Sequence, residues 1–187
     1  MTADSAQLAV RLGVIAIVAV LVQIAALAQI PLFGATADIV PLVVVSAGLL
    51  AGPVAGALMG FAMGLFVDFA LLQTLGVSSL VLVIVGHFAG RLGETARDPQ
   101  ATLLPLAAGA AGTAAALVMF SIMQFLLGVE APVSLELFRQ ILATVLINAL
   151  LALPVYALVR RVLAPAMPET KRRRRRPTSG LSPLISP

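Results

Sequence analysis

Long apolar stretches, separated by short polar ones, run along most of the chain. A helix that crosses the roughly 30 Å hydrocarbon core of a bilayer needs about 17–25 predominantly apolar residues. Six stretches predict membrane-spanning helices, at residues 12–27, 40–51, 54–72, 75–90, 103–127 and 141–159. The second is the shortest and ends at the turn signal Gly52-Pro53, so residues 39–72 could instead hold broken or re-entrant helices. The pattern predicts an all-α integral membrane protein with about six transmembrane helices.

The composition agrees with a lipid environment. Hydrophobic residues make up 60% of the 187 residues and charged residues only 11%, whereas a soluble domain has roughly 25% charged residues. The net charge of +4 could suggest nucleic acid as a partner. Most of the positive charge lies in one tail that begins at Arg160, so we expect no nucleic-acid binding.

Loop charges predict the orientation of the helices. With six spans, the N-terminus, the turn after the second span, the loop after the fourth and the C-terminus share one side. That side holds eleven of the twelve basic residues, namely Arg11, Arg91, Arg97, Arg160, Arg161, Lys171 and Arg172 to Arg176. Only Arg139 lies on the other side. Because short loops rich in Lys and Arg stay in the cytoplasm, both ends of the chain are predicted to be cytoplasmic.

Three parts of the chain follow from this topology. Residues 1–11 form a cytoplasmic N-terminus, residues 12–159 the six-helix transmembrane domain, and residues 160–187 a basic, disordered cytoplasmic tail. The segment Ala26-Leu27-Ala28 resembles a signal-peptidase site. The weak positive charge before the first apolar stretch favours retention of the first span over cleavage.

A row of glycines is the most informative feature of the third span. Gly52, Gly56, Gly60 and Gly64 recur every four residues, and the next step is Asp68. Residues four apart lie on one face of a helix, and small residues let helix backbones approach closely in lipid. The row predicts either internal helix packing or a groove for a partner protein or ligand. An intramembrane carboxylate suggests function, but Asp68 lies near the end of its span, where a structural hydrogen bond is the alternative.

The fourth span carries a second pair of small residues, Gly86 and Gly90, on either side of the chain's single histidine, His87. This pair also predicts close helix packing. A proton relay between His87 and Asp68 is not expected, because the topology places them near opposite membrane faces.

The sixth span carries a polar stripe of Gln140, Thr144 and Asn148 at four-residue spacing. We expect it to face inward, since an unsatisfied polar group in hydrocarbon costs several kcal/mol. Interhelical hydrogen bonds and a polar lining for a small ligand are the two interpretations.

The tail contains a run of like charges, Lys171 and Arg172, Arg173, Arg174, Arg175 and Arg176. Such a run is expected to lie on anionic lipid, with about 1 kcal/mol for each charge near the surface. Docking to an acidic cytoplasmic partner is the other interpretation.

No pattern for catalysis or cofactor binding is recognisable. The chain has no cysteine and one histidine, which excludes cysteine and multi-histidine metal sites. It lacks the Walker, HExxH and Gly-x-Ser-x-Gly motifs. We therefore expect no enzyme activity, no cofactor and no metal.

Four segments together resemble the rod shape-determining MreD family. They are residues 38–43, 60–68, 75–80 and 86–90, within a resemblance that covers roughly residues 12–159. The resemblance implies a non-catalytic subunit of the bacterial cell-elongation machinery in the inner membrane. It would bind MreC and work with MreB, RodA and a class B penicillin-binding protein in peptidoglycan synthesis.

The MreD family is also similar in fold to the substrate-binding S components of energy-coupling-factor transporters. That similarity supports an alternative function, the binding of a small molecule such as a vitamin. Such a component would be expected to offer convergent polar or aromatic groups near the outer leaflet. The loops on that side offer few aromatic residues, which favours the scaffold function.

Overall fold

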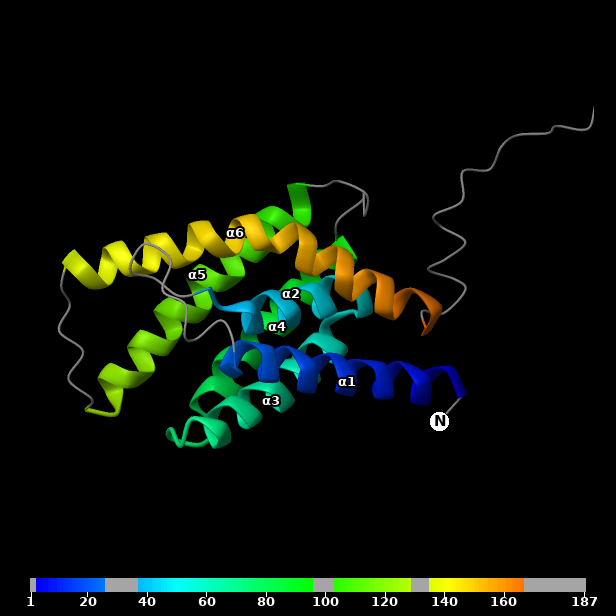
Figure 1. Cartoon of the computed structure of the whole chain (residues 1–187), viewed down its shortest axis with the longest axis horizontal. Coiled ribbons are helices and arrows are strands. Elements are labelled where there is room, and N and C mark those ends of the chain that lie inside the picture. The colour runs from blue at the N-terminus through cyan, green and yellow to red at the C-terminus, as the bar shows by residue number, and fades with distance from the viewer. Residues whose placement is uncertain (1–2, 26–36, 96–102, 129–134, 167–187) are drawn as a thin grey trace, which may run out of the picture.

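The structure is a computed structural model that describes residues 3–25, 37–95, 103–128 and 135–166. These residues form helices and no strand, which confirms the prediction of an all-α protein (Figure 1). The helices are α1 (Ala3–Ala25), α2 (Ile39–Ala51), α3 (Pro53–Ala70), α4 (Val77–Thr95), α5 (Leu103–Leu126), α6 (Leu135–Leu163) and the short 3-10 helix η2 (Ala164–Ala166). The basic run Lys171 to Arg176 lies outside the described residues, so its prediction stays untested.

Five of these helices, α1 and α3 to α6, are long and apolar enough to cross a membrane. The second predicted span is present as α2, but it is only 13 residues long. At 1.5 Å per residue it covers about 20 Å, which is less than the hydrocarbon core of a bilayer. It begins after the N-cap residue Asp38 and ends at Gly52, so a polar cap and a turn limit its length.

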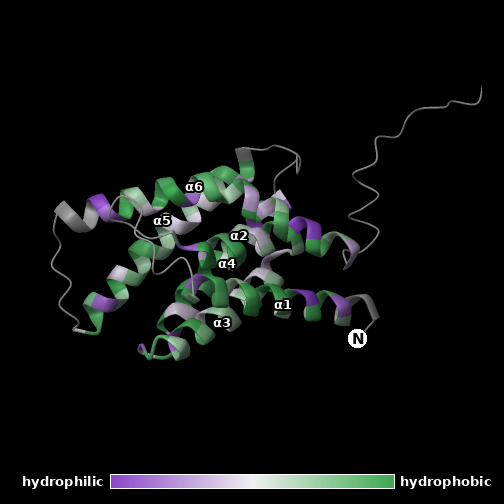
Figure 2. Ribbon diagram, in the orientation of Figure 1, coloured by the Kyte–Doolittle hydropathy of each residue, from purple (hydrophilic) through white to green (hydrophobic). Residues whose placement is uncertain are grey.

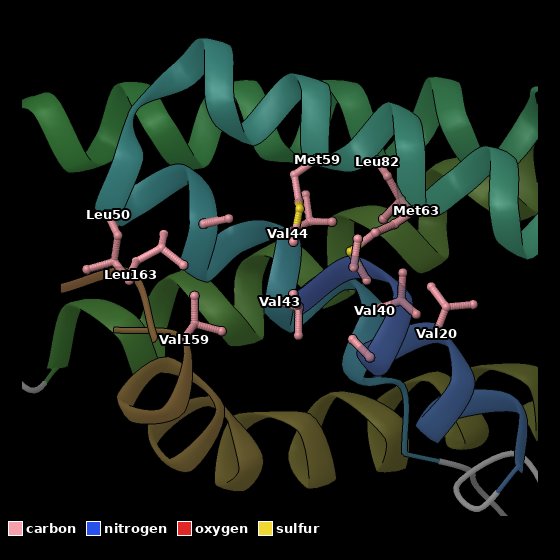
Figure 3. Packing of buried hydrophobic residues seen from close by; sticks show 13 residues of the cluster. Val20, Val40, Val43, Val44, Leu50, Met59, Met63, Leu82, Val159 and Leu163 are labelled. Carbon is pink, nitrogen blue, oxygen red and sulfur yellow. The ribbon is translucent and has the colours of Figure 1, made fainter. Parts of the chain in front are cut away.

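The short helix α2 lies at the centre of the bundle. It contacts each of the other five α-helices, and ten of its 13 residues are buried. A helix that is hydrophobic all round is a buried one, and α2 has only Ser46 as a polar residue. Figure 3 shows α2 packing against four other helices through Val20, Val40, Val43, Val44, Leu50, Met59, Met63, Leu82, Val159 and Leu163.

The start of α1 and the end of α6 lie side by side. The Arg11 guanidinium donates a hydrogen bond to the Val162 carbonyl at 2.7 Å. A cation near the last carbonyls of a helix also interacts favourably with the helix dipole. Leu50, close to the end of α2, belongs to the same core cluster as Leu163, so the turn from α2 to α3 lies at this end as well.

The end of the bundle that holds the start of α1, the end of α6 and the turn from α2 to α3 is called the basic end. The name refers to the arginines that lie toward it, Arg11, Arg91, Arg160 and Arg161. The opposite end, where α3 turns into α4, is called the far end. The helices are mostly hydrophobic along their length (Figure 2), and many of their large hydrophobic side chains are exposed. Val54, Phe69 and Leu150, for example, are each at least 70% exposed, as expected where the surrounding solvent is lipid.

A cysteine-labelling experiment tests which side of the membrane each end occupies. The chain has no cysteine, so single cysteines can be placed at Thr74, exposed at the far end, and at Thr95, exposed at the end of α4. If the basic end is cytoplasmic, a membrane-impermeant maleimide will label Thr74→Cys in intact cells. Thr95→Cys will react only after permeabilisation. The opposite labelling pattern would refute the predicted orientation.

Candidate functional site

Two amide side chains hold the start of α2 inside the bundle. From α6, Asn148 accepts a hydrogen bond from the backbone nitrogen of Asp38 at 3.0 Å and donates one to the Asp38 carbonyl at 2.6 Å. From α1, Gln23 accepts from the backbone nitrogen of Ile39 at 2.9 Å and donates to the Ala37 carbonyl at 3.1 Å. Each amide therefore pairs with one backbone donor and one backbone acceptor, as its geometry allows.

We call the pairing of Gln23 and Asn148 with the start of α2 the amide clamp. Two further hydrogen bonds complete it. The Asp38 carboxylate accepts from the backbone nitrogen of Val40 at 3.1 Å, which makes Asp38 the N-cap of α2. The Asn148 amide also donates to the Thr113 hydroxyl of α5 at 3.2 Å. The N-terminal N–H groups of a helix have no partner within it, and here side chains from neighbouring helices supply partners.

The polar stripe of α6 is only partly directed inward. Asn148 is fully buried and Thr144 is buried, but Gln140 is exposed. The prediction that Gln140 faces inward is therefore wrong. Two steps of four residues turn the helix face by about 80° because one turn takes 3.6 residues. Toward the far end of the bundle, α5 and α6 also diverge (Figure 1).

The glycine row of α3 lies against α4. A Cβ atom at Gly60 would clash with the backbone of Leu82, and one at Gly64 would clash with the backbone of Ser79. One at Gly56 would clash with the carbonyl of Gly86. Only glycine lets the two backbones approach this closely, which is the packing that small residues permit in membranes.

The glycines of α4 belong to the same interface. Gly86 faces Gly56, and Gly90 faces Pro53 at the start of α3. Gly48 of α2 also approaches the Gly86 carbonyl, which a Cβ atom would meet at 2.6 Å. Three helices thus meet backbone to backbone at one level of the bundle.

Gly52 has a different role from the other members of the row. Its φ of 104° lies in a region that L side chains avoid. It joins α2 to α3, which begins at Pro53, the helix position that tolerates proline best. Gly52 is therefore a turn residue between two helices, and its backbone also lies against Gly90 of α4.

Asp68 is fully buried and caps the neighbouring helix. Its carboxylate accepts from the backbone nitrogen of Gly76 at 2.7 Å and from that of Ser78 at 3.3 Å. A carboxylate at the start of α4 also interacts favourably with the helix dipole. The carboxylate of α3 therefore ties the α3–α4 hairpin together at the far end, and this geometry is that of a structural hydrogen bond.

His87 is far from Asp68 along α4. It lies nine residues after Ser78, which corresponds to about 13 Å along the helix axis. Its side chain is exposed on the outside of the bundle, with its ring edge-on to Phe88 at 6.0 Å between centroids and 82° between planes. The geometry does not bring the two ionisable groups together.

Three hollows in the described part of the bundle could take a ligand or a partner. One is a cavity of about 240 Å³ whose lining includes Gln23, Asp38, Gln73 and Ser78. The second is a groove of about 350 Å³ between α4 and α5, and the third a groove of about 450 Å³ between α1 and α3. No group of three possible metal-binding side chains occurs among the described residues.

Sequence reasoning did not single out Gln23 and Thr113. Gln23 is the single polar residue of the stretch 12–27, whereas Thr113 shares the stretch 103–127 with Ser121 and Gln124. An isolated amide within a membrane span needs a hydrogen-bond partner, so the sequence could have predicted that Gln23 forms a hydrogen bond inside the bundle. Its partner, the backbone at the start of α2, could not be identified from sequence spacing.

A family model described as rod shape-determining protein MreD matches residues 7–162. The match covers each of the six α-helices almost completely. No curated protein and no solved structure matches the chain.

Replacing the clamp residue Asn148 is expected to destabilise the bundle. Asn148→Leu leaves the backbone groups of Asp38 without partners, and a buried unsatisfied group costs about 1–3 kcal/mol. The free energy of unfolding in detergent should fall by this amount. Gln140→Leu is the matched control on the same helix, and it should change stability little because Gln140 is exposed. Equal effects of the two changes would contradict the clamp.

Adding one methyl group in the α3–α4 interface is also expected to be destabilising. Gly60→Ala forces the backbones of α3 and α4 apart, and overpacking of this kind costs about 1–3 kcal/mol. The control is Gly13→Ala on α1, where an added Cβ atom has nothing within 4 Å. Thermal unfolding in detergent should show a lower midpoint for the Gly60 variant alone. A similar midpoint for both variants would argue against close backbone contact.

Proposed function

The chain belongs to the rod shape-determining MreD family, and we propose that it is a non-catalytic membrane scaffold of the bacterial cell-elongation machinery. A role in rod shape determination follows from the family. The family is one of membrane proteins, and five helices are long enough to span a bilayer. The finer proposal is that the protein resides in the inner membrane and binds MreC within the bilayer. MreB, RodA and a class B penicillin-binding protein are further members of the proposed complex.

One observation carries the scaffold proposal. Three polar side chains inside the described bundle, the half-buried Gln23 and the buried Asn148 and Asp68, stabilise the fold itself. Gln23, Asn148 and Asp68 pair with backbone groups of the bundle. What the described helices offer to other molecules is mainly an apolar outer surface with grooves. Such a surface suits the docking of other transmembrane helices, which depends on close packing.

The groove between α1 and α3 is the first place to test for MreC. It lies toward the basic end, and its lining includes Leu8, Leu12, Gly13, Ala55 and Leu58. An added Cβ atom at Gly13 has open space around it. A transmembrane helix can therefore approach the α1 backbone at Gly13, which is where small residues favour helix association.

Co-purification with MreC tests the proposal. Affinity-tagged full-length chain, extracted in mild detergent, should retain MreC. Gly13→Leu should reduce the retained MreC because its side chain fills the groove. Replacing Lys171 to Arg176 by glutamine should leave MreC retention unchanged, since the binding is within the membrane.

The opposite pattern, with MreC lost only when the tail is neutralised, would show that the tail and not the bundle binds MreC. Ala157→Leu, at an exposed position on α6, controls for the addition of a large side chain to the lipid-facing surface. Normal rod shape and wall elongation after depletion of the protein would count against the scaffold function itself.

A second candidate function is the binding of a small molecule, as in the S components of energy-coupling-factor transporters. The cavity of about 240 Å³ supports it, because Asp38 and Gln73 add polar groups to a mostly apolar lining. A small ligand that survives purification and is released on denaturation would favour this function. The neighbouring genes also distinguish the two functions. A location beside the gene for MreC would favour the scaffold, and a location beside genes for transporter ATPases would favour the binding of a small molecule.

A further inference from the structure

The groove between α4 and α5 is apolar throughout. Its floor is Val45 of the central helix α2. Phe88 and Leu92 of α4 form one wall, and Ala111 and Ala115 of α5 are part of the other. Phe88 is 68% exposed and Leu92 is 44% exposed. The groove is therefore open to the outside of the bundle, which is lipid for a protein that spans the membrane.

Positive charge lies beside one end of this groove. Arg91 precedes Leu92 at the basic end, and its side chain is exposed. His87 lies one helical turn deeper and is also exposed. Arg91 and His87 do not line the groove itself but flank its wall residues Phe88 and Leu92 along α4. The nearest acid on α4, Glu94, has its carboxylate beside Gly52 at the turn between α2 and α3.

Ionisable side chains on the outside of a transmembrane helix need a partner, because facing hydrocarbon alone is costly for them. Arg91 is near enough to the end of α4 for its long side chain to reach the headgroup region. His87 has a shorter side chain and lies deeper. A single molecule with an anionic head and an apolar chain would satisfy both side chains and fill the groove beside them.

We propose that the α4–α5 groove binds one acyl chain of an anionic phospholipid, with the lipid phosphate at Arg91 and His87. Basic pockets between transmembrane helices are known to favour anionic headgroups. A phosphate accepts charge-assisted hydrogen bonds from a guanidinium. The acyl chain completes the packing between α4 and α5 over Val45. This inference goes beyond the scaffold function and does not depend on MreC binding.

The lining of the groove suits a lipid chain. The alanines Ala111 and Ala115 leave room along α5 for a hydrocarbon chain, which is far thinner than an α-helix about 10 Å wide.

Native mass spectrometry of the full chain tests the lipid site. The protein is reconstituted in phosphatidylcholine nanodiscs that contain a minor fraction of phosphatidylglycerol, the anionic probe. The lipids retained after release are then identified. We expect retained phosphatidylglycerol at about one molecule per chain. Arg91→Gln should lower its retention about fivefold, the factor that corresponds to about 1 kcal/mol per charge near a membrane surface.

A second variant distinguishes binding of the acyl chain in the groove from binding of the phosphate by Arg91. Ala115→Leu fills the groove and should reduce the retention of phosphatidylglycerol and phosphatidylcholine alike. Arg161→Gln and Ala157→Leu are the matched controls, since both residues are exposed on α6 and neither lines the groove. Gel filtration and thermal unfolding verify that each variant is folded.

Two results would overturn the proposal. One is equal lipid retention by Arg91→Gln, Ala115→Leu and their controls. The other is unchanged lipid retention together with loss of a co-purifying membrane protein in the Ala115→Leu variant, which would assign the groove to a protein partner.

Discussion

A helix that begins inside a bundle of membrane helices has backbone N–H groups that the helix itself cannot satisfy. In α2 these groups lie among five other helices, and hydrocarbon offers them no partner. The amide clamp formed by Gln23 and Asn148, together with the Asp38 cap, satisfies them. Because α2 contacts every other α-helix, the position of its first turn determines how α1, α5 and α6 are placed around it.

On the side of α2 that faces α3 and α4, the helix backbones contact one another directly. Gly48, Gly56 and Gly86 let three helices meet without side chains between them. At the far end of the hairpin, Asp68 joins the end of α3 to the start of α4 by two hydrogen bonds. Hydrogen bonds between polar groups and close packing at glycines therefore both hold the helices of this bundle together. Both are needed because lipid provides no hydrophobic driving force for association between helices.

Because the polar side chains and glycines described above serve packing inside the bundle, the outer surface is the part of the bundle that can bind other molecules. The exposed faces of α1, α3 and α6 are largely apolar, and the grooves at α1–α3 and α4–α5 open on that surface. A scaffold that assembles other membrane proteins needs such faces more than it needs polar sites. Arg91 and His87 are exposed polar residues of α4, and an anionic lipid headgroup is the partner proposed for them.

The amino-acid sequence by itself determined the helical class, six apolar segments of which the second is the shortest, the turn at Gly52-Pro53 and the glycine spacing. These features follow from apolar run length and from residue conformation, which are local properties. Only the tertiary structure decided that α2 lies buried at the centre of the bundle, that Gln140 is exposed and that Gln23 pairs with Ile39. Each of these depends on which helices lie beside one another. Spacing along a single helix does not contain that information, because an apolar face looks the same whether lipid or another helix covers it.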